Sequence, residues 1–362
     1  MREALRCTAD EQSVSGRAPL KALGCRALHG VAALASRTSR RRGEFTVRTP
    51  TLPTFTIVSQ PFSLLMPVYR GDDPGHVTRA FQSTVHDQLR RPDEVVVVQD
   101  GLITPELASA LERLESRSPV PVRRLRLHHN VGLAQALQCG LSACTHEVVA
   151  RMDADDISLP HRFAVQMPVI EAGADLVGSA MVEFGHGDAG AGEVTPQGRR
   201  RVPPLGPRAI GAASRLRSPF NHPTVIYRRS AVLEAGGYRD LPLLEDYWLF
   251  TRMIAAGASV ANVAEPLVMY RVDAGSYERR GGLRLLRSEL GLQRRLHREG
   301  FTTHREMARN LVVRGGYRVV PVPLRRAAYR RVFTVQGSPG GTLDWMPVQQ
   351  PARPAPRKGE RA

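Results

Sequence analysis

The sequence predicts an α/β fold with a Rossmann-like, mostly parallel sheet flanked by helices. From residue 62 onward, apolar runs of strand length alternate with stretches of helical spacing, which is the pattern of βαβ units. The runs lack polar alternation, as expected of strands that helices cover on both faces. Acidic residues follow several of these runs, which places them at the carboxyl edge of the sheet, where open α/β sheets bind ligands.

The first half of the chain supports this fold element by element. Strands are expected at 62–69, 94–101, 122–127 and 147–152, each rich in Val, Leu or Ile or in alternating apolar residues. Helices are expected between them at 74–88, 105–116 and 133–144. Pro105 suits the first turn of a helix, because the amide hydrogen that proline lacks has no partner there.

The second half is less regular. A helix is expected at 160–172 and a strand at 175–184, and the Gly-rich stretch 185–198 is either a mobile lid or a plain flexible loop. A strand at 224–227 and helices at 229–235 and 245–256 follow. Residues 283–335 mix Leu and Val with many Arg, so they are amphipathic helices for a membrane surface or solvated helices packed on the core.

Charge is concentrated at the two ends of the chain. The net charge is +17, with ten Lys and Arg against four acids in residues 1–50 and nineteen against five in residues 279–362. Residues 51–278 are therefore left with a net charge of about −3. A nucleic-acid-binding protein is expected to carry its basic stripe on the folded body, so no nucleic-acid partner is expected. Basic peripheral segments suit an anionic membrane surface.

Four segments are expected. They are a disordered basic extension in 1–60, a folded domain in 61–275 whose halves meet near residue 178, a basic helical segment in 276–335 and a disordered tail in 336–362. The four cysteines show no C-x-x-C spacing, which favours a reducing compartment. No apolar run reaches the ~18 residues of a spanning helix. The expected localisation is cytoplasmic, with peripheral contact at the inner face of the plasma membrane.

The most acidic stretch of the folded domain follows the fourth expected strand. Asp153, Asp155 and Asp156 lie within four positions, and adjacent carboxylates repel one another and cannot be buried without partners. Carboxylate oxygens suit Mg²⁺ or Mn²⁺ that carries the phosphates of a substrate. The alternative is a turn that caps the helix expected from Pro160, because Asp is a preferred turn and cap residue. The motif alone leaves both interpretations open.

Further motifs follow in order along the chain. Tyr69 ends the first strand, within Met66-Pro67-Val68-Tyr69, and Asp100-Gly101 ends the second. The later motifs are Pro219-Phe220-Asn221-His222-Pro223-Thr224, Gly236-Gly237-Tyr238 and Glu245-Asp246-Tyr247-Trp248. With these motifs, roughly residues 62–275 closely resemble the inverting family 2 glycosyltransferases. The resemblance implies the GT-A fold, a nucleotide-diphosphate sugar as donor and a divalent cation, Mn²⁺ or Mg²⁺, as cofactor, with the donor bound in 61–178 and the acceptor in 179–275.

On the donor side, the resemblance implies roles for residues near the ends of the first strands. Tyr69, in the motif that includes Pro67, is expected near the nucleobase, with a core aromatic as the alternative. Asp100 matches the acid that contacts the base or ribose, with a simple turn as the alternative. Asn130 and Gly132 match a loop that closes near the donor.

The resemblance also assigns the metal site and the catalytic pair. Asp153 and Asp155 match the motif that holds the cation against the diphosphate, with Asp155 as the direct ligand. Glu245 and Asp246 match the acidic pair of the acceptor half, where Asp246 is the base, and both are also placed to cap the following helix. His222 either contacts the diphosphate or metal or makes a structural hydrogen bond.

These residues fit the chemistry of sugar transfer. A cation neutralises the leaving diphosphate, and a carboxylate on the opposite face takes the proton of the acceptor hydroxyl. Gln99 departs from the family, which often has a second acid there, and no Q-x-x-R-W follows Glu245-Asp246, so a single-addition enzyme is expected rather than a processive synthase. Arg271 is expected to be an ordinary surface arginine rather than a phosphate ligand.

The predicted function is therefore transfer of one sugar to a glycan or lipid-linked acceptor in surface polysaccharide assembly. The alternative within this class is transfer to a polyprenyl phosphate. The alternatives from other classes are a basic nucleic-acid-associated protein, in which the acidic cluster is structural, and a non-catalytic nucleotide-binding module.

Overall fold

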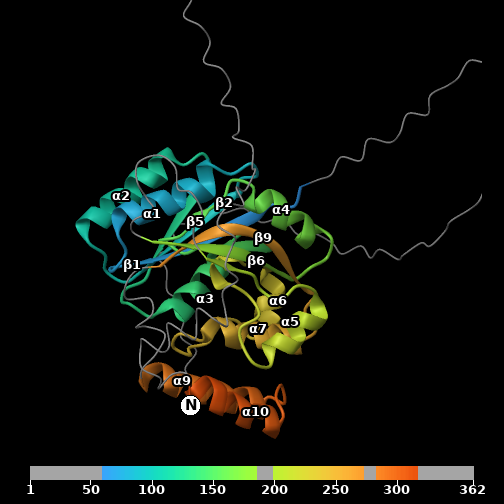
Figure 1. Cartoon of the computed structure of the whole chain (residues 1–362). Helices are drawn as coiled ribbons and strands as arrows, with labels where there is room; N and C mark the ends of the chain where they lie inside the picture. The colour runs from blue at the N-terminus through green and yellow to red at the C-terminus, as the bar shows by residue number, and fades with distance from the viewer. Residues whose placement is uncertain (1–58, 186–198, 273–282, 317–362) are drawn as a thin grey trace, which may run out of the picture. The chain divides into compact units, whose positions relative to one another are not determined.

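The structure, a computed structural model, describes residues 59–185, 199–272 and 283–316. A nine-stranded sheet runs through it in the order β3-β2-β1-β4-β8-β6-β9-β5, with β7 paired to β6 (Figure 1). The strands are β1 (Phe62–Tyr69), β2 (Glu94–Asp100), β3 (Val122–Arg126), β4 (Val148–Arg151), β5 (Ile157–Ser158), β6 (Leu176–Phe184), β7 (Arg200–Arg201), β8 (Ile226–Arg228) and β9 (Val260–Arg271).

Helices connect these strands. They are α1 (Pro74–Phe81), α2 (Pro105–Arg117), α3 (Leu133–Ala143), α4 (Arg162–Glu171), α5 (Pro207–Ser214), α6 (Arg229–Glu234), α7 (Glu245–Ala255), α9 (Leu283–Arg298) and α10 (His304–Asn310), with shorter turns η1 (Gln82–His86), η2 (His222–Thr224) and η3 (Leu311–Gly315). Strands β1 to β4, β6 and β9 run in one direction, and β5, β7 and β8 run against them. The α/β fold with a mostly parallel sheet is thus confirmed.

Alternate residues of the central strands build two cores, one on each face of the sheet. Leu64 and Met66 of β1 pack with side chains of α1, α2 and α4. Leu65 of β1 and Val96 of β2 point to the other face and pack with α3, α5, α6 and α7. The unbroken apolar runs in the sequence follow from this arrangement, because neither face of these strands meets water.

The parallel register gathers the carboxyl ends of three strands. Tyr69, the last residue of β1, is paired with Asp100, the last residue of β2. Leu65 of β1 is paired with Arg151, the last residue of β4, so the acidic cluster that begins at Asp153 follows at the same end of the sheet. Residues that are 31 to 86 positions apart in sequence thereby meet along one edge.

Two glycines allow the turn after β2 to approach the loop before α3. Gly101 has a φ of +83°, and a Cβ atom there would lie 2.6 Å from the backbone nitrogen of Asn130. Gly132, the residue before α3, has a φ of +86°. Side chains other than hydrogen are strained at such angles, so glycine is needed for this close contact. The contact brings the loop 130–132 against Asp100.

The structure contains elements that the sequence pattern did not predict, namely β5, β7, β9 and α5. The twelve-residue strand β9 was missed because Glu265 and Pro266 interrupt its apolar pattern. Its parallel pairing with β6 is shifted near Ala180, which pairs with Pro266. Most of the Gly-rich stretch expected at 185–198 lies outside the described residues, as do the expected extension in 1–58 and tail in 336–362.

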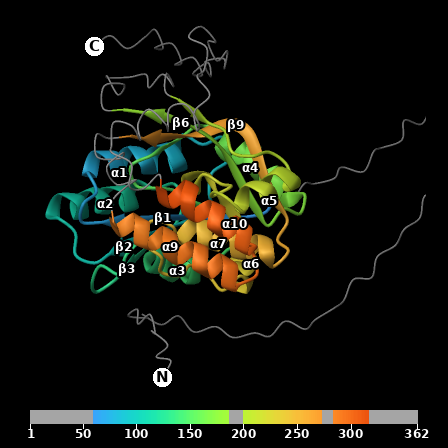
Figure 2. The same ribbon diagram turned by 60° about the horizontal axis from the view of Figure 1, so that its bottom comes forward.

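The basic segment near the C-terminus forms α9, which packs against α7, and α10, which packs against α9 (Figure 2). Leu285, Leu292 and Leu296 of α9 join a buried apolar cluster with Tyr247 and Trp248 of α7. One face of α9 is therefore packed on the folded domain. Residues 317–335 lie outside the described part of the chain. Among the described residues, no helix is long and apolar enough to cross a membrane.

Candidate active site

Arg151, the last residue of β4, organises the carboxylates at the sheet edge. Its side chain is buried, and both of its terminal nitrogens donate to the carboxylate of Asp153, one of them at 2.6 Å. Its positive charge also acts on Asp155 and on Glu245 and Asp246 of α7. The sequence pattern predicts no role for Arg151, although an arginine at the end of an apolar strand, two residues before an acid, is a signal of a buried ion pair.

Asp155 and Asp156 differ in exposure. Asp155 is exposed, whereas Asp156 is fully buried, with its Oδ1 accepting the backbone N–H of Arg271 at 2.8 Å. Asp156 Oδ2 has no hydrogen-bond partner among the described residues. Although Asp155 reaches the surface, the residues packed around it exclude part of its water, and this together with the charge of Asp153 raises its pKa to about 6. Burial raises the pKa of Asp156 well above its usual value. The carboxylates therefore crowd one another.

Arg271 is not the surface arginine that the sequence suggested. This last residue of β9 is only 9% exposed, and its guanidinium lies 4.5 Å from the centre of the Phe184 ring. Its Nε donates to the carbonyl oxygen of Asp155 at 2.8 Å. The prediction was wrong because β9 was not recognised, and its pairing with β6 buries this end of the strand. Arg271 adds a second positive charge to the acidic cluster.

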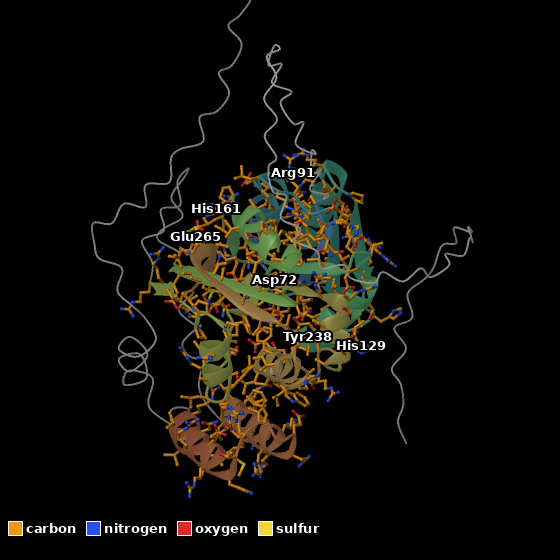
Figure 3. All side chains as sticks on the ribbon, turned by 90° about the vertical axis from the view of Figure 1, so that its right-hand side faces the viewer. Asp72, Arg91, His129, His161, Tyr238 and Glu265 are labelled. Carbon is orange, nitrogen blue, oxygen red and sulfur yellow. The ribbon has the colours of Figure 1, made fainter. Side chains whose placement is uncertain are left out.

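Tyr69 and Asp72 extend the same edge from the end of β1. Tyr69 is 50% exposed, so the alternative of a core aromatic is wrong. Its backbone N–H donates to Asp72 Oδ2 at 2.8 Å. Burial raises the pKa of Asp72 to about 7, and the charges of Asp155 and Asp153 add to this rise. Asp72, labelled in Figure 3, was missed because an Asp pair before a helix is typical of a cap, a role that Asp73 has at α1.

Asp100 at the end of β2 holds the loop before α3. Its Oδ1 accepts the N–H of Val131 at 2.7 Å, and its Oδ2 accepts the N–H of Gly132 and the side-chain amide of Asn130, both at 3.0 Å. The structure therefore joins three of the predicted donor residues into one unit. A contact of Asp100 with the base or ribose stays a prediction, as does the role of Pro67, which is buried inside β1.

Glu245 and Asp246 occupy the first turn of α7. Leu244 holds the cap position and its side chain makes no capping hydrogen bond, but Asp246 Oδ1 accepts the backbone N–H of Tyr247 in the first turn at 2.6 Å, so Asp246 fills part of the expected capping role. Both acids lie where the helix dipole favours negative charge. Burial and then the charge of Asp246 raise the pKa of Glu245 to about 8, and burial also raises the pKa of Asp246. The charge of Asp153 acts on Glu245, so the fold brings this pair to the acidic cluster after β4.

His222, in η2, makes the structural hydrogen bond that was one of its two expected roles. Its Nε2 lies 3.1 Å from the hydroxyl of Tyr238, and its ring packs edge-on against Phe250 at 5.9 Å. Burial and then the charge of Arg151 lower the pKa of His222 well below its usual value, so the imidazole is neutral at pH 7. Tyr238, labelled in Figure 3, also interacts with the charges of Asp246 and Glu245 of α7. Direct contact of His222 with a diphosphate or metal stays a prediction.

The raised pKa values predict how stability depends on pH. Asp155, Asp72 and Glu245 keep their protons in the folded protein up to about pH 6, 7 and 8, whereas the usual values are 3.8 for Asp and 4.5 for Glu. The folded state thus binds more protons than the unfolded state over this range, so the free energy of unfolding falls as pH rises from 4 to 8. Urea unfolding at pH 5 and pH 8 measures this fall.

One variant sharpens this prediction. Glu245→Gln should lose part of the fall, because its amide does not titrate. A free energy of unfolding that rises between pH 5 and pH 8 would contradict the prediction.

The mostly parallel sheet in this strand order, with helices on both faces, has the architecture of the GT-A fold. Among solved structures, the mannosyltransferase PcManGT from Pyrobaculum calidifontis, in complex with GDP-Man and Mn²⁺, superposes with a TM-score of 0.52 over 77% of each chain. Its sequence is 17% identical to this chain, so the likeness concerns the fold.

Sequence comparison identifies the family. The profile of Glycosyl transferase family 2 matches residues 63–236. An uncharacterized glycosyltransferase of Haemophilus influenzae is 35% identical over 271 residues, which are 74% of this chain and 97% of that protein. The UDP-Gal:alpha-D-GlcNAc-diphosphoundecaprenol beta-1,3-galactosyltransferase of Escherichia coli is 32% identical over 276 residues, 75% of this chain and 96% of that protein. The chain belongs to glycosyltransferase family 2 and is a glycosyltransferase.

Proposed function

We propose that this protein is a metal-dependent, inverting glycosyltransferase that moves a single sugar from a nucleotide-diphosphate sugar to a glycan or lipid-linked acceptor in cell-surface polysaccharide biosynthesis. The observation that carries the proposal is the position of Arg151. Its charge acts both on the acids that follow β4 and on the acidic pair of α7. A displacement reaction needs such an arrangement, in which one acidic group would hold the cation that binds the leaving diphosphate and the other provides a base.

Asp246 is the base in this proposal. In-line attack by an acceptor hydroxyl inverts the anomeric carbon and requires a carboxylate opposite the leaving diphosphate. Burial raises the pKa of Asp246, which strengthens it as a base, yet a carboxylate remains weak toward an alcohol. The proton therefore passes to Asp246 as the new C–O bond forms. Glu245, with a pKa of about 8, holds its proton at pH 7 and can donate a hydrogen bond to the acceptor.

The acidic cluster fits a divalent cation, Mn²⁺ or Mg²⁺. Asp155 offers an exposed carboxylate beside Asp153, and the buried Oδ2 of Asp156 lacks a partner among the described residues. Among all described residues, no group of three His, Cys, Asp or Glu side chains could hold a metal ion unaided. The donor diphosphate would therefore complete the ligand set. Asp155 and Asp153 would hold the cation, which when bound neutralises the leaving diphosphate.

The acceptor proposal rests on the relatives. The Escherichia coli relative is named for transfer from UDP-Gal to GlcNAc-diphosphoundecaprenol, which supports a UDP-sugar donor and a sugar linked to a lipid diphosphate as acceptor. The alternative is transfer to the polyprenyl phosphate itself. A transfer assay separates these two acceptors. It offers the lipid-diphosphate-linked sugar or the polyprenyl phosphate together with UDP-, GDP- or dTDP-sugars, in the presence of either Mn²⁺ or EDTA.

The expected product of this assay is a lipid-linked disaccharide that forms only with metal and carries an inverted anomeric centre by NMR. Transfer to polyprenyl phosphate alone would favour the alternative. Absence of transfer from every donor would contradict the proposed function.

A lipid-linked acceptor also suggests that α9 and α10 contact an anionic membrane. Their outward surfaces expose the arginines Arg284, Arg287, Arg294, Arg298, Arg305 and Arg309. Leu283 and Val312 lie in the same segment and are 68% and 75% exposed. Arginines together with exposed apolar side chains suit the surface of a bilayer that contains anionic lipids.

Co-sedimentation with vesicles tests this contact. The chain should bind phosphatidylcholine vesicles that contain phosphatidylglycerol, and binding should fall with salt. Replacing Arg294 and Arg298 by Gln should weaken binding roughly 30-fold, because each arginine near an anionic surface contributes about 1 kcal/mol. The matched control replaces the exposed Arg113 and Arg117 of α2 by Gln and should bind as the wild type does. Equal loss in both variants would contradict a specific role of α9.

A further inference from the structure

Arg314 of the C-terminal helical segment contacts the first turn of α7, where the acidic pair Glu245 and Asp246 lies. It lies in η3, beyond the residues 63–236 that match the family profile. Its guanidinium is 5.1 Å from the centre of the Tyr247 ring, and Tyr247 directly follows Asp246 in the first turn of α7. The positive charge of Arg314 acts on Asp246.

Arg314 is fixed in place by three hydrogen bonds. Its Nε and Nη2 donate to the two carboxylate oxygens of Glu289 at 2.6 and 2.8 Å, and its Nη1 donates to the carbonyl oxygen of Leu216 at 3.1 Å. Glu289 is fully buried in α9, where Gln293 also donates to it at 3.0 Å. A bidentate pair in a buried setting holds the guanidinium in one orientation.

Tyr247 makes hydrogen bonds beside Arg314 and to Asp246. Its hydroxyl donates to the carbonyl oxygen of Ser214 at 2.8 Å, two residues before the Leu216 carbonyl that Arg314 binds. Its backbone N–H donates to Asp246 Oδ1 at 2.6 Å. A continuous series of contacts thus links Glu289, Arg314, Tyr247 and Asp246.

We propose that Arg314 is a positioning residue for the base of the proposed reaction: it fixes Tyr247 and the first turn of α7 and places a positive charge beside that turn. This inference rests on the proposed function. It gives α9 and η3 a supporting role at the acidic pair of α7.

The charges around Asp246 define what removal of Arg314 should do. Among the described residues, the titratable groups that interact with Asp246 include Arg151 of β4, Arg314 of η3, Glu245 and Tyr247 of α7, and Tyr238 of the preceding loop. Of these, the two arginines are positive, and both lower the pKa of Asp246 against the rise caused by burial. Loss of one arginine should therefore raise this pKa and shift the acid limb of the pH profile of kcat/KM to higher pH.

Three variants of the full chain test the proposal. Arg314→Gln alone would leave Glu289 buried without a cation, so the informative variant combines Arg314→Gln with Glu289→Gln. Glu289→Gln alone breaks the ion pair but retains the positive charge beside Asp246. Arg314→Lys retains the charge without the bidentate geometry. Melting temperature and UDP-sugar affinity are measured for each, to show that the fold and the donor site are retained.

The acid limb of the double variant should move up by about one pH unit, with a lower kcat. The acid limbs of Glu289→Gln and Arg314→Lys should stay near that of the wild type. If the acid limb of the double variant does not move, the role of Arg314 is overturned. The same holds if the acid limbs of the double variant and of Glu289→Gln move equally. The proposed function is tested separately: the wild type should transfer sugar and Asp246→Asn should not. A failure of the proposed function can therefore be distinguished from a failure of the role of Arg314.

Discussion

Replacement of Asp246 by Asn should lower kcat by roughly 1,000-fold and leave donor affinity unchanged, because a positioned base contributes on the order of 10² to 10⁴ in rate. The amide has nearly the shape of the carboxylate and can still accept the N–H of Tyr247, which Asp246 Oδ1 accepts at 2.6 Å. It cannot take a proton from an acceptor hydroxyl. Single-turnover transfer and calorimetric titration with a UDP-sugar measure the two quantities.

This variant should also melt at the same temperature as the wild type or higher. Burial raises the pKa of Asp246, which means that the folded protein disfavours its charge, and Asn removes that charge. The matched control is Asp240→Asn, the same change at an exposed acid a few residues upstream, which should transfer sugar normally. Normal turnover by Asp246→Asn would refute its role as the base.

Replacement of Asp155 by Asn should abolish the stabilisation that Mn²⁺ and a nucleotide-diphosphate sugar give together. Mutation of residues that only support metal ligands already costs 10- to 100-fold in metal affinity, so loss of a direct ligand should cost more than about 100-fold. A thermal-shift titration with UDP-, GDP- and dTDP-sugars, with and without Mn²⁺, detects this as the loss of the metal-dependent shift.

Comparison with Asp153→Asn makes the Asp155 test specific. Asp153 pairs with the buried Arg151, so Asp153→Asn should lower stability even without metal, because it leaves a buried guanidinium without its counter-ion. Asp155→Asn should not lower metal-free stability, since it removes a carboxylate whose pKa is already raised to about 6. If Asp155→Asn binds donor and Mn²⁺ as the wild type does, the metal site lies elsewhere.

Most strands and helices of the central domain could be predicted from the sequence, because periodicity reports directly which residues face a core. β1 and α2 lie within one residue of their predicted bounds. β9 could not be predicted, since its register depends on pairing with β6, and Glu265 and Pro266 hide its apolar pattern.

The candidate site was predicted unevenly. Tyr69, Asp155 and Asp246 belong to motifs that follow strands or open a helix, so their order along the chain pointed to them. Asp72 and Arg271 carry no such signal, because an acid before a helix and an arginine after an apolar run are common features. Their place in the site depends on neighbours from other parts of the chain.

The sequence by itself determined the family resemblance, the alternation of strands and helices, and which acids follow which strands. These properties are encoded by local patterns and by the order of motifs. Only the tertiary structure decided which charges act on one another. It placed Arg151 between the two acidic groups, gave His222 a tyrosine partner and brought Arg314 to Asp246. The physical reason is that electrostatic energies depend on distance through the fold and on burial, and separation along the chain specifies neither.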